Sequence, residues 1–518
     1  MLKRIFVLAI VGLICLNAFA DVKLPNIISD DMVLQQQSVA KIWGWAEHGE
    51  QVEVNPLWLD GSVKTVADDN GEWKAEIKTP KAGGPFEIAI KGNNEILLKN
   101  IMIGEVWLCS GQSNMQMSFK PSPWTKGVLN YEEEIANADY PKMRLFTVPN
   151  VSSGEPKDNC GGEWKVCNPE TVADFSAVGY FFGREIHEKL GVAVGLINSS
   201  WGGSPAEAWT RIDYLEDDSD FKPILDRYAK AEETYPEKLN KYEEETLPEW
   251  QKAKAKAEAE GKDVPKKPKK PVGPKVHHRP SGLYNSMIHP LLNLSIKGVI
   301  WYQGESNSWR AYQYRKLFPT MIENWREDFG NSDMPFLFVQ IAPFHYKTEY
   351  IGSELMEAQL LTLKNVENTG MVVTNDLAPN LWDIHPRNKQ DVGKRLSLWA
   401  LAKAYGKDFI AYSGPIYRGV KFEDGKAIVS FDHVYDALTA KGGKLEQFEI
   451  AGEDKEFVKA DAVIKGKKVV VSSDKVAEPV AVRYCWGNTK VGNLYNSGSL
   501  PARPFRTDDW KGVTYNSK

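Results

Sequence analysis

The chain has 518 residues, of which 42% are hydrophobic and 26% are charged. This composition excludes a disordered chain, a collagen and a small disulfide scaffold, and the length predicts about two to four domains. Because 64 lysines and arginines stand against 69 aspartates and glutamates, the net charge is only −5. Nothing in that balance indicates a nucleic acid or an anionic membrane as a partner.

The first twenty residues have the pattern of a secretory signal peptide. A basic start precedes the apolar run IFVLAIVGLICL, and Ala18-Phe19-Ala20 provides a cleavage site before Asp21. We expect residues 1–20 to be removed and the mature protein to be periplasmic or extracellular. A lipid attached at Cys15 is an alternative that the isoleucine before it disfavours. No later run is long and apolar enough to predict a membrane span.

Four cysteines follow the predicted signal peptide. Cys160 and Cys167 are close enough in sequence to close a small loop, and the spacing leaves open whether they form a disulfide. Cys109 lies in the apolar run EVWLC and is typical of a buried strand. The sequence contains no paired CxxC, no HExxH and no EF-hand loop, so no metal site is predicted.

Two parts of the chain have a β rhythm. Over residues 21–100, short apolar runs recur about every ten residues between turn-forming clusters, which predicts a small all-β sandwich. The rhythm returns over residues 411–518 and predicts a second, C-terminal β module. The runs are VAKIWGWA, QVEVNPLWL, EWKAEIKTP, PFEIAIKG and EILLKNIMIG in the first part, and GVKFEDGKAIVSF, FEIAG, KKVVVSS and AVRYCW in the second.

Between them, over residues 101–410, strand-like and helix-like runs alternate. This alternation predicts an α/β fold with a parallel sheet and helices on both faces. The expected strands are 105–110, 143–148, 192–198, 297–303, 335–341 and 370–375, and the expected helices are 177–190, 314–329 and 390–406. Residues 215–275 break the pattern with an Ala/Glu/Lys-rich stretch and a Lys-Pro tail, which indicates a charged helical insertion.

Glycine-rich polar segments follow three of the expected strands. They are SGQSNM (110–115), SSWGGS (199–204) and QGESN (303–307). In open parallel sheets, ligands bind beyond the carboxyl ends of the strands. Each segment alone would be an ordinary turn, but together they bring serine, glycine and amide donors to one sheet edge and predict a catalytic site there.

A serine nucleophile needs a base, and His385 is the best candidate of the eight histidines. It stands in WDIHP, where Pro386 favours an extended backbone, so that Asp383 projects to the same side and can orient the imidazole. His289 and His345 are alternative bases near strand ends. The alternative structure for WDIHP is a turn that caps the next helix.

These segments resemble the sialate O-acetylesterases, a branch of the SGNH (GDSL-like) hydrolases. The resemblance rests on GEVWLCSGQSNM, NSSWGGSPAEAW, GLYNSMIHP followed by IKGVIWYQGESN, and DIHP before a helix, and it runs from about residue 24 into the C-terminal β module. It implies a flavodoxin-like SGNH hydrolase domain flanked by the two β modules. It also implies a serine esterase that needs no cofactor.

The resemblance further implies a role for each motif residue. Ser113 is the expected nucleophile, His385 the base and Asp383 the acid. The expected oxyanion donors are the Ser113 N–H, Gly203, and either Gln303 or Asn307. The motifs depart from the wider superfamily in having GQS, QGESN and D-x-H, which leaves open the third donor and the choice between Asp383 and Asp376 as the acid.

The expected reaction is removal of O-acetyl groups from carbohydrates, in the first place from O-acetylated sialic acids. An esterase for another acetylated glycan, such as xylan or pectin, is the nearest alternative. A noncatalytic glycan-binding protein is the alternative from a different class, because two β modules flank the central domain.

Overall fold

The computed structural model describes residues 21–518, so the predicted signal peptide lies outside the described residues. The central strands are β7 (Glu95–Gly111), β8 (Tyr140–Thr147), β10 (Ala193–Ser200), β11 (Gly298–Tyr302), β12 (Phe336–Val339) and β13 (Thr369–Val372). They lie in the order β13-β12-β11-β7-β10-β8, with every neighbouring pair parallel. An antiparallel strand, β9 (Trp164–Cys167), extends the edge beyond β8. The protein is therefore mixed α/β, and each predicted central strand is present.

Helices cover both faces of this sheet. Helices α4 (Ala177–Leu190) and α10 (Lys389–Lys403) share one core with Trp107 and Cys109 of β7, whereas α8 (Ala311–Asp328) and α9 (Ile351–Asn365) share the other core with Val106 and Leu108. Successive side chains of a strand point to opposite faces, so the apolar run of β7 buries residues on both sides.

Three of these four helices were predicted from the sequence, and α9 was not. Helix α9 is buried on most of its sides, including at Ser353, Glu354 and Gln359. A helix buried nearly all round has no polar stripe of period 3.6, so its sequence gives little amphipathic signal. By contrast, α4 has a serine N-cap at Ser176 and a left-handed Gly191 after its last turn, which are ordinary helix boundaries.

The N-terminal β region is continuous with the central sheet. Its strands are β1 (Val33–Gln35), β2 (Val39–Trp45), β3 (Gln51–Pro56), β4 (Val63–Val66), β5 (Glu72–Lys78) and β6 (Gly83–Lys91). The first part of β7 pairs antiparallel with β6, and its last part, from Gly104 to Gly111, pairs parallel with β10. One strand thus crosses the expected division near residue 100 and belongs to both regions.

The C-terminal β region forms a separate small core. It contains a four-stranded sheet in the order β14-β15-β20-β19 and a second in the order β18-β17-β21-β23. The strands are β14 (Ile416–Glu423), β15 (Lys426–Asp432), β16 (Leu438–Ala440), β17 (Phe448–Ala451), β18 (Val458–Lys459), β19 (Asp461–Lys465), β20 (Lys468–Ser472), β21 (Ala481–Tyr484), β22 (Leu494–Asn496) and β23 (Phe505–Arg506). The chain end then returns to the α/β region, where the Thr514 N–H donates to Glu354 of α9.

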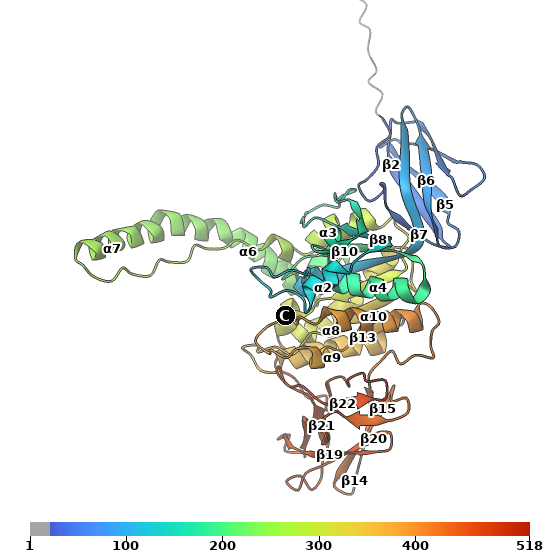
Figure 1. The fold of residues 1–518 in the computed structure, drawn as a ribbon. Coiled ribbons are helices and arrows are strands. Elements are labelled where there is room, and N and C mark those ends of the chain that lie inside the picture. Colours follow the sequence, from blue (N-terminus) through green and yellow to red (C-terminus); the bar gives the residue numbers. More distant parts are fainter. Residues whose placement is uncertain (1–20) are drawn as a thin grey trace, which may run out of the picture.

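The charged insertion projects from the molecule as a helical arm (Figure 1). It consists of α6 (Lys222–Lys241), a π-helical turn (Tyr242–Thr246) and α7 (Leu247–Ala259), followed by an extended return segment. The return lies along the helices, since Trp250 donates to the Pro265 carbonyl and Tyr242 to that of Pro268. Only the base of the arm is anchored in the core, through Ile224.

The four cysteines of the described chain are all buried free thiols, including Cys160 and Cys167. The loop disulfide left open by their spacing is therefore not formed in this structure. Cys167 ends β9 in the core beneath α4, which accounts for its burial without a covalent partner.

Candidate active site

The three polar segments meet at the carboxyl edge of the sheet. Strand β7 ends at Gly111 and leads into the short helix α1 (Ser113–Gln116). The Gln112 N–H donates to the Tyr302 carbonyl at the end of β11, and the Trp201 N–H donates to the Gly111 carbonyl. Gly111 has φ +136°, and a Cβ there would lie 2.3 Å from the Tyr302 oxygen, so this crossing requires glycine.

Ser113 and His385 contact each other. The His385 Nε2 lies 2.9 Å from the Ser113 Oγ, and both residues are partly exposed. The edge of the Trp124 ring packs against the imidazole. Burial, and then the Lys389 ammonium, lower the pKa of His385 below its usual 6.5, while Asp383 acts in the opposite direction. The imidazole is therefore neutral near pH 7 and able to accept a proton.

Asp383 lies beside His385 without a direct hydrogen bond to its ring. The Asp383 Oδ1 is 4.0 Å from the imidazole Nδ1 and accepts the backbone N–H of His385 at 3.0 Å. The 4.0 Å between Oδ1 and Nδ1 is too long for a hydrogen bond. The other candidate acid, Asp376, binds the Arg395 guanidinium through both oxygens, at 2.7 and 2.6 Å.

The WGG loop packs against Ser113. A Cβ on Gly202 would lie 3.3 Å from the Ser113 Cβ, and the Gly202 N–H donates to the Gln116 side chain at 2.7 Å. The carbonyl of Gly203 accepts from the His278 Nε2 at 2.9 Å. Within residues 21–518 the Gly203 N–H has no hydrogen-bond acceptor, so it is open to a ligand.

Gln303 and Asn307 lie buried behind this loop and are already engaged. The Gln303 Nε2 donates to the Asn307 Oδ1 at 2.7 Å and to the Ser204 carbonyl at 3.2 Å. The Asn307 Nδ2 donates to Glu207 at 2.8 Å. These hydrogen bonds fix the two amide side chains relative to each other and to the WGG loop. None of these bonds is to Ser113.

Glu207 anchors this buried amide group. It lies 2.6 Å from the Arg310 guanidinium, and both side chains are almost fully buried. Burial alone would raise the pKa of Glu207, but the charge of Arg310 and the hydrogen bond from Asn307 hold that pKa below its ordinary value. Glu207 is thus a carboxylate that fixes Asn307 behind the WGG loop.

A second buried network, not predicted from the sequence, connects the loop of Ser113 with that of His385. The Asn114 Nδ2 donates to Glu305 at 2.8 Å and to the Ile384 carbonyl at 3.0 Å, and the Lys389 Nζ donates to the Asn114 Oδ1 at 2.7 Å. Burial lowers the pKa of Lys389 to about 7 and raises that of Glu305. Asn114 and Glu305 stand inside the quoted motifs, but nothing in the sequence marks Lys389.

Two of the other histidines have partners of their own, and two more lie at the WGG loop. His345 stacks on Trp382, and His289 donates from Nδ1 to the Lys157 carbonyl, so neither alternative base binds Ser113. His277 and His278, which the sequence places beside the Lys-Pro tail, reach the WGG loop instead. Their position depends on the return path of the arm, which the sequence does not reveal.

Metal-binding clusters and membrane-spanning helices are both absent from residues 21–518. No cluster of three or more histidine, cysteine, aspartate or glutamate side chains there has the geometry of a metal site. No helix in the same range combines the length and apolarity needed to cross a membrane.

Comparison with known proteins connects this geometry to a family. Residues 272–401 match a family described as carbohydrate esterase, sialic acid-specific acetylesterase. The sialate O-acetylesterase of Rattus norvegicus is 30% identical over 454 residues, which is 80% of each chain. That of Mus musculus is 28% identical over 96% of each chain. A carbohydrate acetylesterase of Xanthomonas citri, whose crystal structure is known, is 35% identical, with a TM-score of 0.79 over 95% of this chain and all of that one.

Proposed function

Because the chain belongs to the sialate O-acetylesterase family, and is therefore a carboxylic ester hydrolase, we propose that Ser113, His385 and Asp383 form its catalytic triad. The observation that carries the proposal is the 2.9 Å contact between the Ser113 Oγ and the His385 Nε2. It is the geometry that a serine nucleophile and its base require.

The reaction is acyl transfer to and from Ser113. Neutral His385 takes the hydroxyl proton as Oγ attacks the acetyl carbonyl, and the tetrahedral intermediate collapses as the imidazolium returns the proton to the departing sugar oxygen. A water molecule then attacks the acetyl-enzyme with the same base, releasing acetate and restoring the serine. The Asp383 carboxylate, 4.0 Å from Nδ1, stabilises the imidazolium through its charge.

The oxyanion is held by backbone and amide donors. The Ser113 N–H begins α1, and the Gly203 N–H lies free on the adjoining loop. Asn307 is the better third donor. The Gln303 Nε2 already donates two hydrogen bonds within residues 21–518, whereas the Asn307 Nδ2 donates one. Electrostatic stabilisation by such preorganised donors is usually the largest single contribution to catalysis.

The substrate is an acetylated carbohydrate, and within that class we propose O-acetylated sialic acids. The proposal includes export by the residue 1–20 signal peptide to the periplasm or the outside of the cell. It also assigns the reaction to residues 101–410 as a flavodoxin-like SGNH domain, flanked by β modules over 21–100 and 411–518. Acetylated xylan or pectin is the alternative substrate.

The test is acetate release from 9-O-acetyl sialic acid, acetyl-xylan and acetylated pectin by the wild type and by Ser113→Ala. Faster turnover of the sialic acid ester, lost in Ser113→Ala, supports the proposal. Faster turnover of xylan or pectin moves the substrate to the alternative. No acetate release from any ester, with no labelling of Ser113 by a fluorophosphonate probe, contradicts the catalytic proposal.

A further inference from the structure

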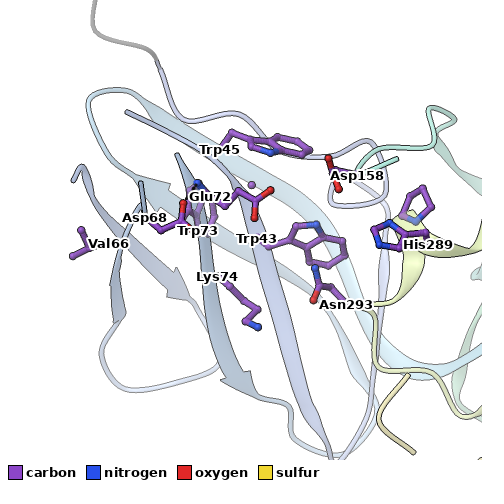
Figure 2. Close-up of a pocket in the computed structure, with 12 residues that line it drawn as sticks. Trp43, Trp45, Val66, Asp68, Glu72, Trp73, Lys74, Asp158, His289 and Asn293 are labelled. Atoms are coloured by element: carbon purple, nitrogen blue, oxygen red, sulfur yellow. Dashed lines mark hydrogen bonds between the residues drawn. The ribbon is translucent and has the colours of Figure 1, made fainter. Parts of the chain in front are cut away.

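A cleft lies at the junction of the N-terminal β region and the α/β region. Its volume is about 260 Å³, and it separates the β2–β5 pair from the 3-10 turn η5 (His289–Leu291). Figure 2 shows the indoles of Trp43 and Trp45 extending from β2 toward Asp158, His289 and Asn293 on the opposite side. Neither Ser113 nor its partners line this cleft.

The pairing of β2 with β5 determines which side chains face the cleft. Trp43 is opposite Lys74 and Trp45 is opposite Glu72, so these four project from the same face of the pair. Trp43 is only 7% exposed because the α/β region covers much of it. Two indoles on one strand, flanked by a cation and a carboxylate, form one wall of the cleft.

Several polar groups around the cleft have no partner within the described chain. Within residues 21–518, the side chains of Glu72, Asp158 and Asn293 form no hydrogen bond or ion pair. His289 uses Nδ1 for the Lys157 carbonyl and so presents Nε2 as its free ring nitrogen. Polar groups that face an aromatic wall across a cleft are typical of a binding site.

We propose that this cleft is an accessory site for a neutral pyranose residue of a glycan chain. A pyranose has an apolar face of C–H groups that packs on an indole, and a rim of hydroxyls that carboxylates and amides bind. Three carboxylates, Asp68, Glu72 and Asp158, surround the cleft, against a single lysine, Lys74. An anionic sugar such as sialic acid is therefore disfavoured there.

The location indicates what the site does for catalysis. The residues that line the cleft lie in the N-terminal β region, at Asp158 and around η5, and none belongs to the segments of Ser113 and His385. A ligand held in the cleft would therefore bind apart from the ester at Ser113. The cleft would therefore hold an unreacting part of a polymeric substrate, an inference that rests on the proposed carbohydrate esterase function.

The experiment measures binding and hydrolysis separately. Binding of cellohexaose, xylohexaose, mannohexaose and N-acetylneuraminic acid is measured by calorimetry on the full chain carrying Ser113→Ala, alone and combined with Trp45→Ala or Glu72→Gln. Trp58→Ala is the matched control, since Trp58 lies in the same β region but donates to the Lys78 carbonyl away from the cleft. Acetate release from a small acetyl ester is measured in the same variants with Ser113 intact.

We expect at least one neutral hexasaccharide to bind, and Trp45→Ala to weaken that binding at least about tenfold, as for a central aromatic contact. Glu72→Gln, an exposed change that leaves the fold intact, should weaken it to a smaller extent, and Trp58→Ala should not. Hydrolysis of the small ester should be the same in all three. The proposal is overturned if no neutral hexasaccharide binds, if neither cleft variant weakens binding, or if N-acetylneuraminic acid binds more tightly than every neutral sugar. If the wild type hydrolyses no acetyl ester, the proposed function is contradicted, and the binding result is unaffected.

Discussion

The Nε2 of His385 lies 2.9 Å from the Oγ of Ser113, although 272 residues separate them in the chain. The neighbours of these two residues hold the contact in place. Asn114 donates to the carbonyl of Ile384 and accepts from Lys389, so the residue after Ser113 is joined to the chain both before and after His385. Buried hydrogen bonds of this kind fix the geometry before substrate arrives.

Replacing Ser113 with alanine should abolish acetyl-ester hydrolysis while leaving thermal unfolding nearly unchanged. The hydroxyl is the proposed nucleophile, whereas within residues 21–518 the one side chain that it hydrogen-bonds is that of His385. Acetate release and the melting temperature measure the two effects. Activity within tenfold of the wild type would exclude Ser113 as the nucleophile.

Replacing Asp383 with asparagine should lower kcat by about 10³- to 10⁴-fold, as loss of an orienting carboxylate does in serine hydrolases. The Asp383 Oδ1 lies 4.0 Å from the Nδ1 of the His385 imidazole. Asp376→Asn should reduce stability more than kcat, because it breaks the two-bond pair with Arg395. The two variants are compared at saturating substrate and by thermal unfolding. A larger loss of kcat in Asp376→Asn would assign the acid role to Asp376.

Burial of His385 and the Lys389 ammonium should together set the acidic limit of activity. Because His385 must be neutral to act as a base, kcat/KM rises as pH increases through its pKa, and burial together with Lys389 lowers that pKa. Lys389→Met removes the cation, so the pKa of His385 should rise and the acidic limb should move to higher pH. The pH profile of kcat/KM measures the shift. Lys389→Arg keeps the charge, and an identical profile in all three proteins would remove Lys389 from this role.

Replacing residues 237–271 with a short Gly-Ser bridge should leave a folded, active enzyme. The deletion removes the outer arm but retains Ile224 and Arg227, which contact the core and Glu207 at its base. Little buried apolar surface is lost, so the free energy of unfolding should change by no more than about 1 kcal/mol. Denaturant unfolding and acetate release provide the measurements. Loss of the cooperative transition would mean that the outer arm packs into the folded structure.

The local sequence was informative wherever one element determined its own structure. Each predicted central strand is present, as are the helices that begin near residues 177, 314 and 390. The sequence did not indicate α9, whose buried polar residues hide the helical period. It also left the cysteine pairing open, because two thiols close in sequence need not have the geometry of a disulfide.

The sequence by itself determined which motif residues lie together at the carboxyl edge of the sheet, because parallel strands place their carboxyl ends together and Ser113, Gly203 and Gln303 each follow such a strand. It also placed Asp383 two residues before His385. Only the tertiary structure decided how these groups are engaged: Asp376 is bound to Arg395, Gln303 and Asn307 to each other, and Lys389 to Asn114. Such hydrogen bonds join residues that are distant in the chain, and the free energy that selects one buried partner over another arises only after the elements have packed and water has been excluded.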